Sequence, residues 1–289
     1  MLVLFTDSDC DITPDIAKYY GFELISMPYN INEKEIYPYV DFDEFKVKEY
    51  YDQLRKGTLP TTSALSPLKY IEYFEPHFAA GNDILYVHFS KAMSGTFNSL
   101  NLALQELKEK YPERNFYTID TKAITALSYL VVTEIGRLVK QGKTIDELLA
   151  WANTEVDKYA IYFYADDLTF FKRSGRVSGF SGVMGNLLGI HPIIHMSSEG
   201  KMVNLAKARG KRNSLNKIID MVSEIEEDIA NYPVIIAHSD CLEIAHELEK
   251  LMKERFGENL KTEYVVVNPT AGAHCGPNCV GVAFHAKHR

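Results

Sequence analysis

Hydrophobic residues follow two spacings along the first half of the chain. Short runs of β-branched and aromatic residues indicate strands, and between them apolar residues recur with the 3.6-residue period of a helix. The run at 83–89 is typical of a buried strand, and Leu100, Leu104 and Leu107 share one face of the helix predicted after it. The other elements expected in this half are strands at 2–7, 22–31 and 115–120 and helices at 13–21 and 43–57.

The order of the elements changes from Ile161 onward. A strand-like run is followed by a glycine-rich stretch, and the next two apolar runs are separated by a Ser-Glu-Gly turn that favours an antiparallel pair. After this pair, helices and strands alternate again. The expected elements are strands at 161–168, 191–196, 201–209, 233–239 and 263–269 and helices at 214–231 and 242–256.

These patterns predict an α/β protein of two domains. Strands that are each followed by a helix favour a parallel, doubly wound sheet for residues 1–156. The second half predicts an α+β domain with a mixed or antiparallel sheet over residues 157–289. No linker-like stretch marks the boundary, which we place just before Asp157.

Composition narrows the possible functions. With 289 residues and 46% hydrophobic side chains, the chain can bury a large core and is not disordered. Its 31 Lys and Arg against 39 Asp and Glu give a net charge of -8, which disfavours nucleic-acid and anionic-membrane partners. No stretch approaches the ~20 apolar residues of a membrane span, and the start does not resemble a signal peptide. We therefore expect a soluble, cytoplasmic protein without stable membrane insertion.

Polar loops follow several of the predicted strands. In open α/β sheets, ligands bind beyond the carboxyl ends of the strands, where loop hydroxyls and helix N-terminal amides converge. Ser94 and Gly95 open a predicted helix, so their hydroxyl and N–H groups suit a carboxylate or phosphate, although Ser94 also fits a simple N-cap. Thr62, in a second such loop, and Ser8, in a third, are candidates with an alternative as turn residues.

Two basic segments and one histidine add further candidates. Arg173 lies in a run of three cations ahead of the small and large apolar residues at 179–189, which suit either the lining of a tunnel or ordinary packing. Arg209 lies in a second basic run, which favours a solvated patch or a docking surface for an anionic protein. His274, in a glycine-rich turn, could donate a hydrogen bond to an oxyanion or be a structural histidine.

Metal and nucleotide sites are disfavoured. Cys275 and Cys279 flank three residues but lack a second pair of ligands at zinc-finger spacing. Gly136 and Gly142, ahead of Lys143, enclose five residues where a Walker A loop has four, so no nucleotide loop is present. With only four cysteines, a disulfide framework is not expected either.

Nine motifs in order along the chain resemble the DegV family of bacterial fatty-acid-binding proteins, which includes the acyl-binding subunit of fatty acid kinase. The motifs are FTDSDCDI, LPTTSALSP, HFSKAMSGTFNSL, TIDTKAIT, FFKRSGRVS, HPII with a GK turn, KARGK, IAHSD and GAHCGPNCVGVAF. The resemblance implies a two-domain α/β fold that holds one long-chain fatty acid between the domains, with the carboxylate buried. Carried over by motif, Thr62, Ser94, Gly95 and His274 bind the carboxylate, and Arg173 and Arg209 lie near the site mouth and the kinase-docking surface.

The resemblance therefore implies a lipid-binding protein, without a cofactor, that presents its ligand to a separate ATP-dependent kinase. Two alternatives stay open. An acyl hydrolase using Ser94 and His274 would lack the G-x-S-x-G motif, and a polyol carrier like the subunits of dihydroxyacetone kinase would have to bind a polar ligand at the apolar segment. The sequence leaves open the length and unsaturation of the acyl chain, the oligomeric state, the identity of the kinase and the role of Cys275 and Cys279.

Overall fold

The computed structural model describes residues 1–178 and 189–289, and its first half is built on a parallel sheet. This sheet, sheet A, has the strand order β2-β1-β6-β7 with every neighbouring pair parallel, which confirms the predicted parallel sheet. Its strands are β1 (Leu2–Asp7), β2 (Phe22–Ile25), β6 (Asp83–His88) and β7 (Phe116–Asp120).

Helices cover both faces of sheet A. On the outer face α3 and α4 pack against each other, and Leu100 and Leu107 of α4 are buried as predicted. On the inner face α5 contacts strands of both large sheets, so most of its side chains are buried. The helical segments of this half are the 3₁₀ turn η1 (Ser8–Cys10), α1 (Pro14–Tyr20), α2 (Val47–Arg55), α3 (Pro67–Ala79), α4 (Thr96–Lys110), α5 (Thr125–Lys140), α6 (Ile145–Glu155) and the 3₁₀ turn η2 (Val156–Lys158).

The second half is built on a mixed sheet, sheet C. Its order is β13-β12-β14-β8-β10-β11-β9, and β10 and β11 form the predicted antiparallel pair. The strands are β8 (Tyr159–Ala165), β9 (Val177–Ser178), β10 (Ile190–Met196), β11 (Met202–Arg209), β12 (Val234–His238), β13 (Thr262–Val266) and β14 (Cys279–His285). The helices are α7 (Thr169–Ser174), α8 (Lys211–Ile225), α9 (Leu242–Phe256) and α10 (Pro269–Cys275).

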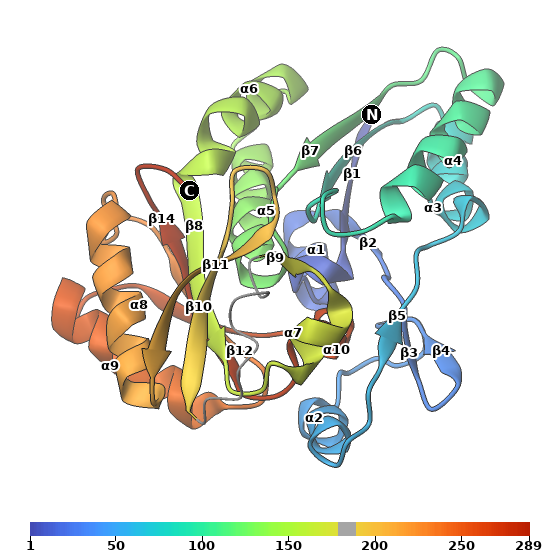
Figure 1. Cartoon of the computed structure of the whole chain (residues 1–289). Coiled ribbons are helices and arrows are strands. Elements are labelled where there is room, and N and C mark those ends of the chain that lie inside the picture. The colour runs from blue at the N-terminus through green and yellow to red at the C-terminus, as the bar shows by residue number, and fades with distance from the viewer. Residues whose placement is uncertain (179–188) are drawn as a thin grey trace.

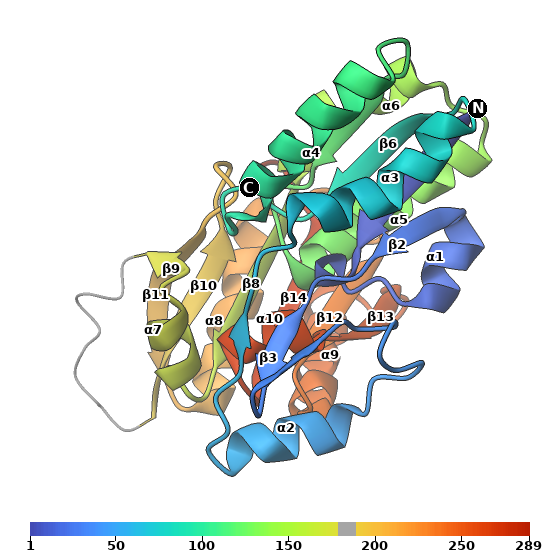
Figure 2. The same ribbon diagram turned by 90° about the vertical axis from the view of Figure 1, so that its right-hand side faces the viewer.

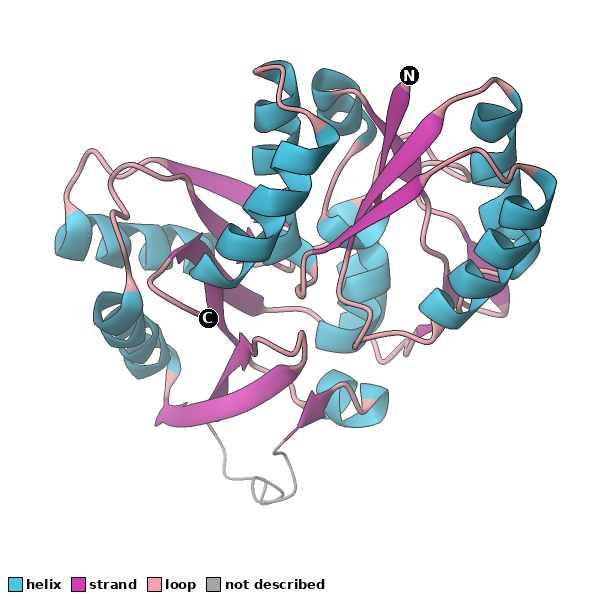
Figure 3. Ribbon diagram, turned by 90° about the horizontal axis from the view of Figure 1, so that it is seen from above, coloured by secondary structure: helices cyan, strands magenta, loops and turns pink. Residues whose placement is uncertain are grey.

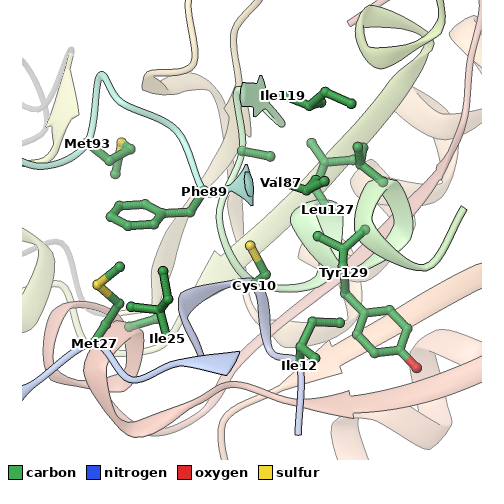
Figure 4. Close-up of a cluster of buried hydrophobic side chains, with 14 of the residues drawn as sticks. Cys10, Ile12, Ile25, Met27, Val87, Phe89, Met93, Ile119, Leu127 and Tyr129 are labelled. Carbon is green, nitrogen blue, oxygen red and sulfur yellow. The ribbon is translucent and has the colours of Figure 1, made fainter. Parts of the chain in front are cut away.

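The two sheets and their helices form consecutive layers (Figures 1 and 3). Helices α3 and α4 lie outside sheet A, α5 lies between the sheets, and α8 and α9 cover the far face of sheet C. One buried cluster runs through the interior and includes Ile84 of sheet A, Leu127 of α5 and Phe163 of sheet C. Figure 4 shows part of this cluster around Cys10 and Leu127. The apolar faces of both sheets are therefore buried against shared side chains.

A small third sheet belongs to the first half of the chain and packs against α10 of the second half. Strands β3 (Tyr29–Ile31), β4 (Lys34–Ile36) and β5 (Thr61–Thr62) pair in the order β4-β3-β5 (Figure 2). Tyr50 and Tyr51 of the neighbouring helix α2 donate hydrogen bonds to the carbonyl oxygens of Pro269 (2.6 Å) and Val267 (2.9 Å). This segment of the first half is thereby fixed to α10 of the second.

Two sequence predictions about element bounds were wrong. The strand expected at 22–31 is two strands in different sheets, because Pro28 lies between them and cannot donate a ladder hydrogen bond. The helix expected at 214–231 begins at Lys211, after Gly210 (φ 82°), and ends at Ile225, where Glu226 turns extended and pairs with Ala286. The boundary between residues 156 and 157 stays a prediction.

No helix within residues 1–178 and 189–289 combines the length and the hydropathy needed to cross a lipid bilayer.

A close approach between α10 and α2 gives a first test of the fold. A Cβ at Gly272 would lie 2.7 Å from Tyr51 Oη and 3.2 Å from Tyr50 Cε1, so Gly272→Ala should lower the free energy of unfolding by about 1–3 kcal/mol. Because Tyr51→Phe removes the nearest atom, Gly272→Ala with Tyr51→Phe should be less destabilised than the sum of the single variants. Urea unfolding of the four proteins measures this coupling, and strictly additive losses would contradict the contact.

Candidate functional site

An apolar cavity lies between the two large sheets. Strands of sheet C form one wall with Ile161, Phe163 and Met202, and Met27, Phe89 and Met93 form another. Figure 4 shows these last three side chains gathered on one side of the buried cluster. The cavity encloses about 970 Å³ of space, solvent at its mouth included. Its walls suit a long apolar ligand.

Thr62 and His274 form a polar pair on the cavity wall. Thr62 Oγ1 of β5 lies 2.9 Å from His274 Nε2 of α10, although 212 positions separate them in the chain. The prediction that His274 lies in a turn was wrong. Asn268 caps a short helix by accepting the N–H of Ala271, and Pro269 starts it, so His274 lies in its last turn.

The environment of His274 keeps its imidazole neutral. Burial, helped by the charges of Arg176 and Arg173, lowers the pKa of His274 from 6.5 to about 4. At pH 7 one ring nitrogen is therefore a donor and the other an acceptor. An anion beside the ring would oppose both effects and raise this pKa.

Ser94 also lines the cavity and lies just ahead of α4. Its Oγ accepts the N–H of Thr96 at 3.2 Å, but the N-cap of α4 is Gly95, so the alternative of Ser94 as the N-cap is wrong. Because the hydroxyl accepts in this bond, its proton remains available to a ligand. Gly95 is exposed and is not among the described residues that line the cavity, so the structure brings together Thr62, Ser94 and His274 but not Gly95.

The predicted arginines lie outside the cavity. Arg173 Nη1 donates to the carbonyl oxygen of Leu59 at 2.9 Å and so attaches α7 to the chain just ahead of Thr62. Arg209 is exposed at the end of β11. Sequence reasoning missed Arg176, which lines the cavity from the cationic run that also holds Arg173. The predicted tunnel segment lies almost wholly outside the described residues, which omit 179–188.

Asp9 is a second cavity residue that the sequence prediction missed. It lies in η1, within a run of three aspartates directly after β1. Only 6% of its surface is exposed, and its Oδ1 has no hydrogen-bond partner among the described residues. Burial, together with the charges of Asp7 and Asp11, raises the pKa of Asp9 well above its usual range. Burial therefore favours the neutral, protonated form of this carboxyl.

Cys275 and Cys279 line the cavity as buried free thiols. Across the described ranges, no group of three or more His, Cys, Asp or Glu side chains is placed to hold a metal ion.

Comparison with known proteins identifies the family. The family model described as "Uncharacterised protein, DegV family" matches residues 1–287. The chain belongs to the DegV family. A DegV domain-containing protein of Clostridium perfringens is 34% identical over 286 residues, which cover 98% of this chain and 96% of that protein.

Solved structures share the fold of this DegV family member over its whole length. A stearic acid-binding protein from Eubacterium ventriosum has a TM-score of 0.85 at 21% identity, with 99% of both chains covered. The Fatty Acid Kinase B3 protein of Streptococcus pneumoniae, loaded with linoleic acid, has a TM-score of 0.82 at 18% identity, with 99% of this chain and 100% of that chain covered. The two-domain α/β fold is therefore confirmed.

The charge state of Asp9 predicts a pH-dependent stability. Because its pKa is higher in the folded than in the unfolded protein, the folded state binds more protons above about pH 4, and stability falls as pH rises toward the folded pKa. Asp9→Asn removes this dependence. Relative to the variant, the native protein should lose unfolding free energy between pH 5 and 7, by at most about 1.4 kcal/mol per pH unit. Urea unfolding at both pH values measures the difference, and a constant difference would show that Asp9 is ionised in the folded protein.

Proposed function

We propose that this protein binds one long-chain fatty acid, with its carboxylate at Thr62, Ser94 and His274 and its acyl chain in the apolar cavity. The observation that carries this proposal is the Thr62–His274 pair on the wall of a cavity that is otherwise mostly apolar. The names of the solved relatives, which bind stearic and linoleic acid in the same fold, support it.

The acyl chain supplies most of the affinity. Burial of about fourteen methylenes of a C16 chain at ~0.8 kcal/mol each gives roughly 11 kcal/mol before the entropy losses of association. A small polar ligand would leave the apolar walls unused, which disfavours a polyol carrier.

The polar groups satisfy the carboxylate. An unpaired buried carboxylate costs several kcal/mol, whereas the hydroxyls of Thr62 and Ser94 and one ring N–H of His274 can donate to it. To do so, Thr62 turns its proton from His274 to the ligand and the imidazole presents its own N–H. The head group thus sets the position of the chain along the cavity. Gly95, exposed beside Ser94, belongs to the mouth in this arrangement.

The protein acts as a non-catalytic carrier in this proposal, with no cofactor and in the cytoplasm, and presents the carboxylate to a separate ATP-dependent kinase. A hydrolase is disfavoured because Ser94 lies outside a G-x-S-x-G motif and, among the described residues, no hydrogen bond joins Ser94 to His274. The Streptococcus pneumoniae neighbour, a fatty acid kinase protein by name, supports the link to a kinase.

The basic patch around Arg209 is the proposed docking surface. Lys211 and Arg212 pair with Asp166 and Glu247, whereas Arg209 has no ion-pair partner in the described part of the chain. An unpaired exposed cation is available to steer an acidic partner. Arg173, which holds the loop ahead of Thr62, lies nearer to the site mouth.

The purified protein should carry about one long-chain fatty acid per chain. Native mass spectrometry before and after delipidation measures the mass difference, and lipid extraction identifies the acid. Co-purification of phosphosugars only, with no uptake of added palmitate by the delipidated protein, would refute the proposal.

Thr62→Val tests the proposed carboxylate site, since valine keeps the volume of threonine and removes its hydroxyl. Loss of a hydrogen bond to a charged group costs about 1.5–3 kcal/mol, so palmitate affinity should fall roughly ten- to a hundredfold. Thr61→Val on the same strand is the matched control, because Thr61 is exposed and is not among the cavity residues. Fluorescent fatty-acid displacement measures both variants, and equal affinities would remove Thr62 from the site.

Arg209→Ala should leave palmitate occupancy unchanged and lower the rate of acyl-phosphate formation with an acyl kinase from the same organism. The loss should shrink as ionic strength rises, because salt screens the advantage of the native protein. Arg255→Ala removes another exposed arginine, one that pairs with Asp220 in the C-terminal half of α8, and should not change the rate. Loss of palmitate from Arg209→Ala, with normal turnover of the loaded remainder, would contradict a docking role.

A further inference from the structure

One polar group in the cavity wall has no function in the proposal so far. Asp9 is more than nine-tenths buried, it lines the cavity, and its Oδ1 has no hydrogen-bond partner within the described residues. A buried polar atom without a partner costs about 1–3 kcal/mol, so the fold maintains this carboxyl at a disadvantage unless a ligand satisfies it.

The two neighbouring aspartates have structural partners, and Asp9 does not share them. Asp7 accepts from the hydroxyl of Tyr86 (3.0 Å) and the N–H of Phe89 (3.1 Å). Asp11 accepts from both the backbone N–H (2.9 Å) and the side-chain amide (2.7 Å) of Asn268. These two carboxyls hold the loop together, whereas Asp9 lines the cavity.

Other polar side chains of the cavity wall are also engaged within the protein. Thr96 accepts from Leu65 N–H, and Thr270 donates to the carbonyl oxygen of Met27. Thr62, Ser94 and His274 form the proposed carboxylate site. Among the described residues that line the cavity, Asp9 is the one with a buried side-chain oxygen that lacks a hydrogen-bond partner.

Asp9 and the proposed carboxylate site lie on different elements of the cavity wall. Asp9 lies in η1, which packs against α5, whereas Thr62 and His274 lie on β5 and α10, which pack against each other. A carboxylate placed beside Asp7, Asp9 and Asp11 would raise their pKa values further, because like charges disfavour the ionised form. Since Thr62, Ser94 and His274 hold the carboxylate in the proposed function, Asp9 is left to the acyl chain of the ligand.

We propose that Asp9 recognises a hydroxyl group on the acyl chain, so that the preferred ligand class is hydroxylated long-chain fatty acids. This inference rests on the proposed fatty-acid function and adds its substrate class. A protonated carboxyl has one O–H donor and one carbonyl acceptor, and a hydroxyl group has the same two capacities, so the pair can form two reciprocal hydrogen bonds. A ketone on the acyl chain would accept from the Asp9 O–H but could not donate to its carbonyl oxygen. An acyl chain without a polar substituent would form neither hydrogen bond.

The competing explanation is that an ordered water satisfies Asp9 while an acyl chain without a hydroxyl group occupies the cavity. A site of this kind would show no preference for a hydroxyl group, whereas a hydroxyl that replaces such a water and keeps its hydrogen bonds gains affinity. Ligand selectivity therefore distinguishes the two.

Stearate and a series of hydroxystearates with the hydroxyl moved along the chain are titrated against the delipidated native protein, Asp9→Asn and Asp9→Ala. One position of the hydroxyl should bind at least about tenfold more tightly than stearate in the native protein. Asp9→Asn keeps a donor and an acceptor of the same size and should retain most of this ratio. In Asp9→Ala the ratio should fall to about one, because the partner is gone.

The outcomes separate this inference from the proposal on which it rests. If stearate binds and no hydroxystearate is preferred, or if the preference survives in Asp9→Ala, the role of Asp9 is refuted while the fatty-acid function stands. If neither stearate nor any hydroxystearate binds the native protein, both are refuted. Circular dichroism of each variant establishes that the comparison is made on folded protein.

Discussion

The position of α10 depends on hydrogen bonds from residues more than 200 positions away in the chain. Asp11 accepts two from Asn268, Tyr50 and Tyr51 donate to carbonyl oxygens beside it, and Thr270 donates to Met27. These contacts join both halves of the chain around one short helix. Without them His274 would not face Thr62, since nothing within a seven-residue helix fixes its place in the fold.

Burial determines the charge of the groups on the cavity wall. Burial disfavours the charged form of each group, which is the protonated imidazole of His274 and the deprotonated carboxyl of Asp9. It therefore lowers the pKa of His274 to about 4 and raises the pKa of Asp9 well above its usual range. The deep wall therefore offers hydrogen bonds and little fixed charge, while Arg176 supplies a cation on the lining. A ligand with one carboxylate and a long apolar chain complements this distribution.

The sequence predicted the elements well where periodicity was strong. The strand at 83–89, the apolar face of α4 and the β10–β11 pair were confirmed, because each depends on local spacing and burial. The motifs predicted that Thr62, Ser94 and His274 bind the same ligand group, and in the structure all three line one cavity. The family resemblance supplied that grouping, since local spacing cannot show that residues 62 and 274 meet.

The features of the site that the sequence did not predict depend on long-range packing. The helical setting of His274 was missed because its glycines suggested a turn, and the Asn268 cap that starts the helix is held by Asp11. Asp9 was missed because three aspartates in five residues are typical of a polar loop. Only the fold reveals that Asp9 lines a mostly apolar cavity and that its buried Oδ1 has no partner among the described residues. Arg173 and Arg176 are three positions apart, yet only Arg176 lines the cavity.

The central claim is that a fatty-acid carboxylate is bound, ionised and out of water, beside Thr62 and His274. NMR of palmitate labelled with ¹³C at its carboxyl group tests this most directly. The account predicts one resonance from the bound ligand whose shift does not change between about pH 5 and 8, since charge-assisted hydrogen bonds hold the ionised form, and the shift should move in Thr62→Val. A bound carboxyl that titrates through this range like one in water would contradict the account.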